Sequence, residues 1–300
     1  MLYWLKQAKR GPEMKTAVVT TSSAYLTAEQ CETYGIKVIH APVLFGNRLY
    51  QEGVDLDSNL FYRLLKTEKK QIPTPAQASM DELTPLFTDL AHEGYEDVII
   101  IGLAGGLSGF INTLTTYAQN VTALQVWPWD SYGVCASTGY QALLAGQLAQ
   151  NGLSVQEILA RLSVLRSRLK SVWLLDSLRP LSRTGQINLN PVSDLLKGKP
   201  ILTFTEQGQV KVTGSARFDR SALNESVKLL GQDEKDADYL LRATVVNGDD
   251  RESMQEWLDK LAAELPNIQF EEGIIGPYVG TLMGSGAMGL VWGQDWKSLT

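Results

Sequence analysis

A glycine-rich segment in the first half of the chain is the strongest candidate for a binding site. The apolar run Val98–Ile101 leads into Gly102-Leu103-Ala104-Gly105-Gly106-Leu107-Ser108-Gly109, and a helical pattern follows. A strand, a glycine-rich loop and a helix start bring backbone N–H groups together where a negatively charged group can bind. The segment has neither the Gly-x-Gly-x-x-Gly spacing of dinucleotide loops nor the Gly-Lys-Ser/Thr of P-loops. It therefore favours a small-molecule site over a nucleotide site, with a purely structural tight turn as the alternative.

Residues for catalysis are hard to assemble from this sequence. Ser108, Ser131 and Ser285 have no Gly-x-Ser-x-Gly elbow around them and no evident histidine partner. Of the 2 histidines, His40 falls in an apolar strand pattern typical of a structural residue, and His92 ends a predicted helix, where a cation suits the helix dipole. We therefore expect a protein that is not an enzyme, with no catalytic residues and no cofactor.

An acidic loop is the one candidate metal site. Glu52, Asp55 and Asp57 lie close together in the sequence and carry the oxygen ligands that hard cations prefer. A solvated turn in which Asp57 caps the following helix explains the same residues and is the favoured interpretation. We therefore expect no bound metal.

Composition and charge exclude several classes of partner. The formal net charge of −6 argues against nucleic acid, which requires a surplus of Lys and Arg on one face. The 2 cysteines, Cys31 and Cys135, lie far apart and fit reduced thiols in a cytoplasmic protein. Residues 1–13 contain no apolar run long enough for a membrane span or a signal peptide. We expect these residues to form a flexible leader arm and the protein not to be an integral membrane protein.

Two domains follow from the order of the predicted elements. In residues 14–170, strands at 17–19, 36–45, 97–101 and 124–128 alternate with helices, three of which begin at the capping boxes of Thr27, Ser79 and Ser154. This alternation predicts an α/β domain with three layers and a mostly parallel sheet. Residues 171–300 hold more strands and fewer helices, which predicts an α+β domain with a mixed or antiparallel sheet. The predicted strands are 172–175, 201–204, 210–214, 239–246 and 269–275, and the helices are 221–230 and 251–265. The glycine-rich stretch 276–289 predicts a loop that passes close to a ligand or to another backbone.

Several motifs together resemble one family. They are Val19-Thr20-Thr21-Ser22-Ser23-Ala24-Tyr25-Leu26, Tyr50-Gln51-Glu52-Gly53-Val54-Asp55, Pro73-Thr74-Pro75-Ala76-Gln77, Gly105-Gly106-Leu107-Ser108-Gly109, Asp130-Ser131, Lys199-Pro200-Ile201-Leu202 and Gly284-Ser285-Gly286-Ala287-Met288-Gly289. In order and spacing this set resembles the DegV family of bacterial fatty-acid-binding proteins, from Met14 to about Trp292.

The resemblance implies a function without chemistry of its own. In this family the two domains enclose one long-chain fatty acid, whose carboxylate is held by hydroxyls and basic groups. A separate kinase phosphorylates the bound acid, which serves fatty acid uptake and phospholipid metabolism. The protein is thus expected to be a non-catalytic, cytoplasmic lipid carrier with a fatty acid kinase as its possible partner.

The resemblance also assigns site residues. The residues expected at the ligand head group are Thr74, Gly105, Gly106, Ser108, Gly109 and Ser131. Further residues expected to line the pocket are Ser22, Gln77, Leu107, Phe110, Ile111, Asn112, Gln186 and Leu282. We expect an elongated apolar cavity between the domains, with Leu107, Phe110, Ile111 and Leu282 in its wall.

Departures from the family pattern concern its charged groups. Gln186 stands where the family has an arginine, and Leu282 where it has a histidine. Ser215 and Asp219 replace basic residues of the stretch associated with kinase docking. The resemblance therefore predicts weaker docking of a kinase and a head group that is protonated, neutral or near solvent. The alternatives are a divergent member that binds a neutral or different lipid, or a regulatory or interaction protein that does not support phosphoryl transfer.

Overall fold

A four-stranded parallel sheet forms the centre of the first half of the chain. The computed structural model describes residues 15–188 and 198–300, and its first sheet has the order β2-β1-β6-β7. The strands are β1 (Lys15–Thr21), β2 (Ile36–Ile39), β6 (Tyr95–Gly102) and β7 (Gln125–Asp130). Residues 98–101 of β6 are fully buried, as an inner strand covered on both faces requires. The predicted parallel sheet is confirmed.

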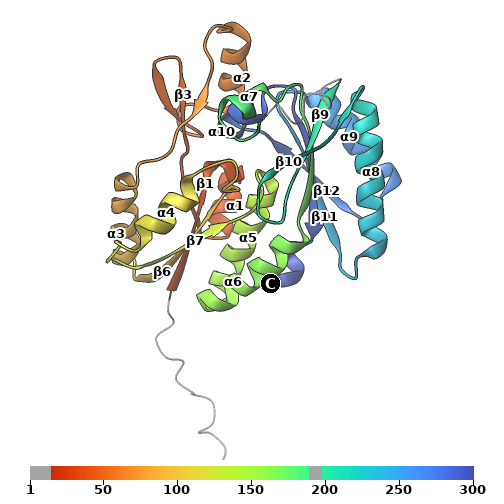
Figure 1. Cartoon of the computed structure of the whole chain (residues 1–300). Helices are drawn as coiled ribbons and strands as arrows, with labels where there is room; N and C mark the ends of the chain where they lie inside the picture. Colours follow the sequence, from red (N-terminus) through yellow and green to blue (C-terminus); the bar gives the residue numbers. More distant parts are fainter. Residues whose placement is uncertain (1–14, 189–197) are drawn as a thin grey trace, which may run out of the picture.

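Helices cover both faces of this sheet. On one face α3 (Thr84–His92) and α4 (Phe110–Ala118) pack in a shared apolar cluster with β6 and β7. On the other face lie α5 (Ala136–Gln150) and α6 (Val155–Arg168), while α1 (Ala28–Thr33) packs beside β2. The expected three layers are therefore present (Figure 1).

Two of the three predicted capping boxes form. Thr27 caps α1 with Gln30, and Ser154 caps α6 with Glu157. The prediction at Ser79 is wrong, because its side chain caps no helix and α3 begins only at Thr84, after a short 3₁₀ turn. Pro85 explains the later start, since proline is preorganised for the first turn of a helix.

A small antiparallel sheet projects from the first half. It has the order β4-β3-β5 and contains β3 (Pro42–Phe45), β4 (Arg48–Gln51) and β5 (Thr74–Pro75), with α2 (Ser58–Thr67) between β4 and β5. Figure 1 shows it above the main sheet, connected through the end of β2. The single strand predicted over 36–45 is therefore wrong, because the chain leaves the main sheet after Ile39. His40 at this break is exposed and lies outside both strands, so its predicted place in a strand is wrong. Its ring Nδ1 is nevertheless hydrogen-bonded to Glu52 O at 2.8 Å, which suits a structural role.

The second half of the chain is built on a six-stranded mixed sheet of order β10-β9-β8-β13-β11-β12. Its strands are β8 (Lys170–Leu174), β9 (Lys199–Phe204), β10 (Val210–Ala216), β11 (Leu241–Asn247), β12 (Gln269–Ile274) and β13 (Met288–Gln294). β11 and β12 are parallel and the other neighbours are antiparallel. The helices α8 (Asp219–Asp236) and α9 (Arg251–Glu264) cover one face, which confirms the predicted α+β half.

Most of the glycine-rich segment near the C-terminal end belongs to a helix and a strand of the core. Residues 277–283 form the buried helix α10 (Pro277–Met283), and β13 runs through the middle of the second sheet. The loop predicted over 276–289 is therefore wrong for α10 and for the start of β13. It is correct for residues 284–287, which pass close to another backbone, since Gly286 N donates to Gly248 O at 2.7 Å. Glycine serves packing here, because a Cβ on Gly289 would lie 2.4 Å from the ring of Trp173.

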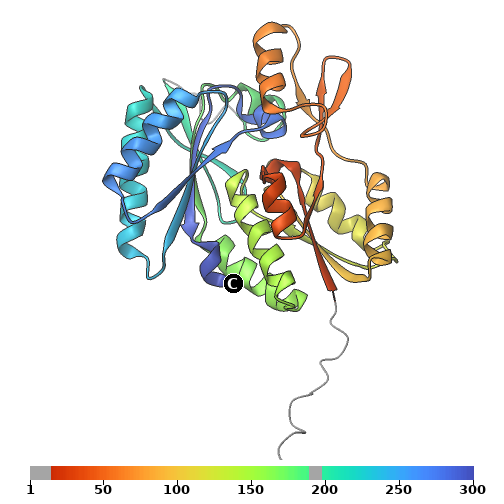
Figure 2. The same ribbon diagram turned by 180° about the vertical axis from the view of Figure 1, so that it is seen from behind.

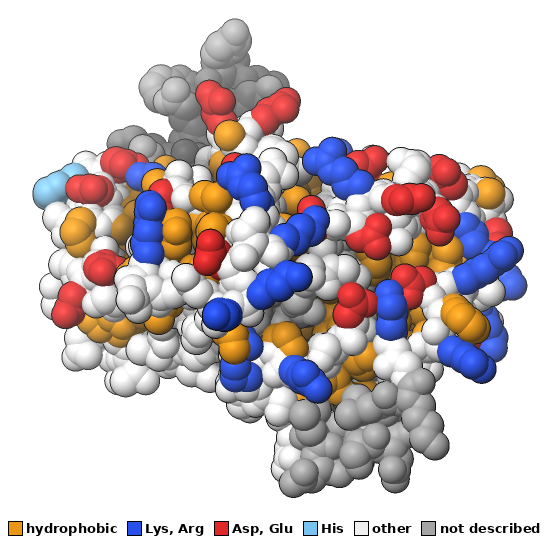
Figure 3. Space-filling model, turned by 90° about the horizontal axis from the view of Figure 1, so that it is seen from above, with side chains coloured by type: hydrophobic (Ala, Val, Ile, Leu, Met, Phe, Trp, Pro, Cys, Tyr) orange, Lys and Arg blue, Asp and Glu red, His pale blue; other side chains and the backbone are white. Residues whose placement is uncertain are grey.

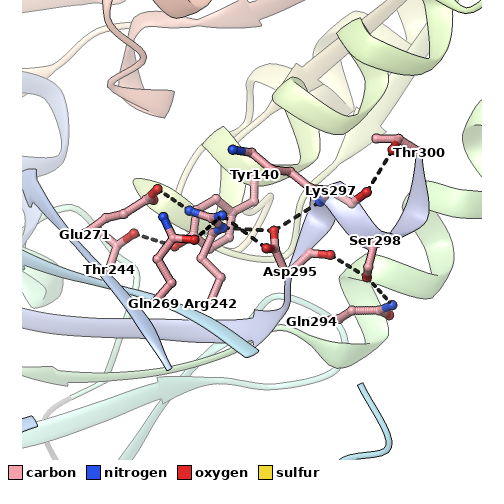
Figure 4. A network of polar contacts seen from close by, with 10 residues as sticks. All are labelled: Tyr140, Arg242, Thr244, Gln269, Glu271, Gln294, Asp295, Lys297, Ser298 and Thr300. Carbon is pink, nitrogen blue, oxygen red and sulfur yellow. Dashed lines mark hydrogen bonds and ion pairs between the residues drawn. The ribbon is translucent and has the colours of Figure 1, made fainter. Parts of the chain in front are cut away.

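Helix α5 joins the two halves. Eleven of its residues are buried, so it is enclosed on all sides, and both ribbon views place it with α6 between the two sheets (Figures 1 and 2). Tyr140 of α5 is hydrogen-bonded to Thr244 of β11 at 2.5 Å. Next to this pair, Arg242 is 2% exposed and bonds to Glu271, Gln269 and Asp295 (Figure 4).

The second sheet begins with β8 at Lys170. The division into domains of residues 14–170 and 171–300 stays a prediction. The predicted leader arm, residues 1–13, lies outside the described residues.

Candidate functional site

The glycine-rich loop after β6 is tied to the end of β7 by the half-buried carboxylate of Asp130. Asp130 accepts a hydrogen bond from Gly105 N at 3.0 Å with one oxygen and from Tyr132 N at 2.9 Å with the other. Burial raises the pKa of Asp130, and the two backbone donors and the charge of Arg166 oppose that rise. The anion that the loop's N–H groups attract is therefore supplied in part by the protein itself.

The same loop touches the second half of the chain. A Cβ on Gly106 would lie 2.3 Å from the carbonyl oxygen of Gly208, in the turn between β9 and β10. Only glycine allows this approach of two backbones. The position of Ser108, two residues further along, thus depends on the fit between the two halves.

Ser108 and Tyr278 form the polar centre of a small cavity between the halves. Their hydroxyl oxygens are 3.1 Å apart and hydrogen-bonded, which joins the start of α4 to α10. The cavity beside them has a volume of about 20 Å³. Its lining residues are Thr21, Ser23, Ile39, Ala41, Pro42, Ala76, Gln77, Ala78, Leu103, Ser108, Phe110 and Tyr278. This volume holds about one water molecule, so the cavity at Ser108 is not the elongated one expected from the sequence.

A buried glutamate holds α10 in place. Glu52 is 2% exposed and accepts hydrogen bonds from Ser22 Oγ at 2.5 Å, Tyr25 Oη at 3.1 Å and Tyr278 N at 2.8 Å. Burial raises its pKa, and the three donors act against that rise. Burial and the nearby charge of Glu52 raise the pKa of Tyr278. Glu52 therefore caps α10 from the opposite half of the molecule.

The acidic loop around Glu52 behaves differently from the expectation. Asp57 caps α2 through Leu60 N, which confirms its predicted role, but Glu52 is buried and so the prediction of a solvated turn is wrong for it. Asp55 is exposed and pairs with Arg48 at 3.2 Å. Within residues 15–188 and 198–300, no group of three His, Cys, Asp or Glu side chains could hold a metal ion.

The structure brings some of the predicted site residues together. Gln77, Ser108 and Phe110 line the small cavity, and Gln186 donates its side-chain N–H to Leu107 O at 3.2 Å. Gly105, Gly106 and Gly109 lie in the loop that carries Ser108. The position of Gln186 beside this loop comes from tertiary structure, since 79 residues separate it from Leu107.

Other predicted residues lie apart. Thr74 and Asn112 are exposed, the Ser22 hydroxyl is used by Glu52, and Ser131 is buried and bonded to Thr138. Leu107 and Leu282 belong to the apolar cluster between the halves, whereas Ile111 and Phe110 belong to the cluster under α3 and α4.

For three residues the role in the site was not predicted from the sequence. Glu52 was considered only as a metal ligand or as part of a solvated turn, and Tyr278 and Arg183 were not considered. Arg183 ends helix α7 (Arg179–Arg183) and donates Nη2 to Pro73 O at 3.0 Å, next to Thr74. Glu52 stood in a quoted motif, so its presence was a signal; its burial was not visible. Tyr278 and Arg183 gave no signal, because their partners are 170 and 110 residues away.

None of the helices described by the structure is both long and apolar enough to cross a membrane.

Comparisons with known proteins agree with this architecture. The family model described as "Uncharacterised protein, DegV family" matches residues 15–295. Protein DegV of Bacillus subtilis is 31% identical over 282 residues, covering 93% of this chain and 99% of that protein. A DegV domain-containing protein of Listeria monocytogenes is 32% identical over 282 residues, covering 93% and 98%.

Solved structures show the same fold. The crystal structure of DegV, a fatty acid binding protein from Bacillus subtilis, superposes with a TM-score of 0.86 at 30% identity, covering 94% of this chain and 99% of that one. A DegV family protein from Thermus thermophilus, described for its fatty acid binding, superposes with a TM-score of 0.84 at 22% identity. The match covers 94% of this chain and 100% of that one. With its parallel sheet, its mixed sheet and the hydroxyl-lined contact between them, this chain belongs to the DegV family.

Proposed function

We propose that this protein binds one long-chain fatty acid or a closely related lipid between its two halves and performs no chemistry on it. The observation that carries the proposal is the position of the Ser108–Tyr278 pair. Their cavity is lined by hydroxyls on one side and borders the apolar cluster between the halves through Ala41, Leu103 and Tyr278. A polar end and an apolar end in contact are what an amphipathic ligand requires. The fatty acid named for the Bacillus subtilis relative supports this ligand class.

Binding requires the cavity to open. Sites for small molecules typically enclose about 300–1,000 Å³, and the Ser108 cavity has about 20 Å³. Burial of an acyl chain stabilises the complex by about 0.8 kcal/mol for each methylene, which offsets the cost of separating α10 from the first half. We therefore infer that the ligand enters as the Ser108–Tyr278 contact opens.

The head group is proposed to be a protonated acid or another neutral polar group. Among the residues that line the cavity, none is Lys, Arg or His, and hydroxyl and amide groups supply the polar contacts. The carboxylate of Glu52 accepts a bond from Tyr278 N, so a second negative charge beside Tyr278 is disfavoured. An ionised carboxylate has Arg183 as its alternative partner, near Thr74 at the outer rim.

Lipid recovered with the protein tests the proposed function. Native mass spectrometry of the protein purified from its source cells, followed by solvent extraction, is expected to show one long-chain lipid for each protein chain. A protein that carries no lipid, and that binds neither palmitate nor hexadecanol in titrations, contradicts the proposal.

Adding a cation at the cavity tests the head-group assignment. Gln186→Arg places a guanidinium beside Leu107 O and Ser108, where it pairs with an ionised acid. We expect palmitate to bind about 10-fold more tightly to the variant at pH 8, and hexadecanol to bind as before. Leu282→His, the other change that the family pattern suggests, is avoided because Leu282 is fully buried in the apolar cluster. If wild type and variant bind palmitate with equal affinity, the carboxylate does not bind beside position 186. Arg183→Ala is then the next variant, because Arg183 is the alternative partner of the carboxylate.

A fatty acid kinase is the proposed partner, with weakened docking. In this segment Arg217 and Arg220 are exposed, but Ser215 is uncharged and Asp219 pairs with Lys199 at 2.8 Å, so the segment presents fewer cations than the basic stretch of the family pattern. Charge at an interface rim mainly sets the association rate and the choice of partner. We expect slow formation of acyl phosphate with a kinase from a related bacterium, and rapid formation at physiological salt contradicts this prediction.

A regulatory member of the family that binds a neutral lipid is the second candidate function, favoured by the uncharged lining of the Ser108 cavity. The unpaired thiols of Cys31 and Cys135 support the proposed cytoplasmic location.

A further inference from the structure

A second, much larger cleft lies between α6 and α8. Its volume is about 930 Å³, which is within the range of small-molecule sites, and it shares no lining residue with the Ser108 cavity. The floor is formed by strands of the second sheet and includes Val172, Ile201 and Trp292. In Figure 1, β9 and β10 pass between the two helices that form the walls.

The α6 wall presents a cation, Arg166, that is held between two aromatic rings; the Asp130 carboxylate is near enough to interact with its charge but forms no ion pair with it. The guanidinium carbon of Arg166 lies 4.0 Å from the ring centres of both Trp129 and Tyr132. Its Nη1 donates to the carbonyl oxygen of Asp130 at 2.7 Å. No carboxylate in the described part of the chain forms an ion pair with it. The two aromatic rings fix the plane of the guanidinium and leave N–H groups for an oxyanion.

The backbone beside this cation is strained. Tyr132 has φ of +56°, in the left-handed region that bulky residues avoid. Asp130 holds this conformation by accepting a hydrogen bond from Tyr132 N at 2.9 Å. Strain of this kind persists where the surrounding structure enforces it, and ligand sites are a common location.

The α8 wall presents negative charge. Asp233 is already neutralised by Lys170 at 2.7 Å and by the Trp292 Nε1 donor at 2.7 Å. Glu225 is exposed, lines the cleft and forms no ion pair with the described residues. Among its described lining residues the cleft therefore has one cation without an ion pair, Arg166, and two exposed carboxylates without one, Glu225 on the α8 wall and Glu206 in the turn between β9 and β10.

We propose that this cleft binds a small zwitterion, with its phosphate or carboxylate on Arg166 and its amine towards Glu225. A planar guanidinium accepts an oxyanion through two parallel hydrogen bonds. Glu206, Glu225 and Asp233 line the same cleft and disfavour ligands with several negative charges. The apolar floor at Val172 and Ile201 accommodates the carbon body that joins the two charged groups.

Titration with a zwitterion, and with two smaller ligands that each carry one of its charges, tests this site. Phosphoethanolamine carries both charges, while inorganic phosphate and ethanolamine each carry one of them. By calorimetry on the full chain, we expect binding in the order phosphoethanolamine, phosphate, ethanolamine. Arg166→Gln should weaken phosphoethanolamine and phosphate at least 10-fold. Glu225→Gln should weaken phosphoethanolamine about 5-fold, while phosphate should bind as well as before or more tightly, because a like charge is removed.

Controls separate the site from general effects. Arg161→Gln removes a cation from the same helix whose Nη1 bonds to Leu299 O, and it should leave all three titrations unchanged. If Arg166→Gln does not fold, Arg166→Lys keeps the charge without the planar fork and should still lose several-fold affinity for phosphoethanolamine. Failure of phosphoethanolamine to bind at 10 mM, or equal binding to wild type and the Arg166 variants, overturns the proposal. Lipid binding at Ser108 is unaffected by either result.

Discussion

Replacing Glu52 with alanine should lower the free energy of unfolding by about 3 kcal/mol or more, the largest effect we expect from one polar side chain. The change leaves Ser22 Oγ, Tyr25 Oη and Tyr278 N without their buried acceptor. Because Tyr278 lies in the first turn of α10, the helix loses the acceptor that caps it from the first half. Urea denaturation of the full chain at pH 7 measures the loss. A decrease below 1 kcal/mol shows that α10 is held by apolar packing alone.

The pH dependence of stability provides the matched control for this residue. The pKa of Glu52 is raised in the folded state, chiefly by burial, so the folded protein binds more protons than the unfolded chain. Its contribution to stability is therefore greatest below the ordinary glutamate pKa of about 4.3 and declines as pH rises through the raised value. Glu52→Gln keeps an acceptor for Tyr278 N and removes the titration. The variant should gain stability relative to wild type between pH 4 and pH 8, and parallel profiles of the two proteins contradict the assignment.

Gly106→Ala should lower the free energy of unfolding by about 2–3 kcal/mol, the upper range for overpacking, and weaken lipid binding as well. The added Cβ lies 2.3 Å from Gly208 O and 3.0 Å from Gln209 Cα. Both contacts are with backbone, so the loop before Ser108 and the turn between β9 and β10 must separate. Displacing Ser108 breaks its 3.1 Å bond to Tyr278 and changes the polar end of the cavity. Thermal unfolding and palmitate titration measure the two effects.

Gly214→Ala is the control for this prediction. Gly214 lies in β10, on the same hairpin, and a Cβ there meets no atom within 4 Å. The added methyl group removes backbone freedom from the unfolded chain, so stability should change by less than about 1 kcal/mol. Equal losses at Gly106 and Gly214 show that the hairpin tolerates no side chain anywhere, and they remove the argument from close approach.

The local signals in the sequence predicted most of the elements. The capping boxes at Thr27 and Ser154 and the apolar run of β6 depend on neighbours a few residues away, and all three are confirmed. The glycine-rich segment at α10 and the start of β13 was predicted as a loop, because many glycines indicate a loop when their surroundings are unknown. Gly289 is instead required by the ring of Trp173, which reaches it across the sheet from β8.

The candidate site also shows this difference between local sequence signals and contacts made by tertiary structure. The sequence alone identified the glycine-rich loop 105–109 and the hydroxyl of Ser108, because these are properties of residue type and order. The depth at which Glu52 is buried, the Ser108–Tyr278 bond and the approach of Arg183 to Pro73 were decided by tertiary structure alone. Burial and pairing depend on which distant segments pack together. The sequence does not distinguish a carboxylate that faces water from one that caps a helix in another part of the chain.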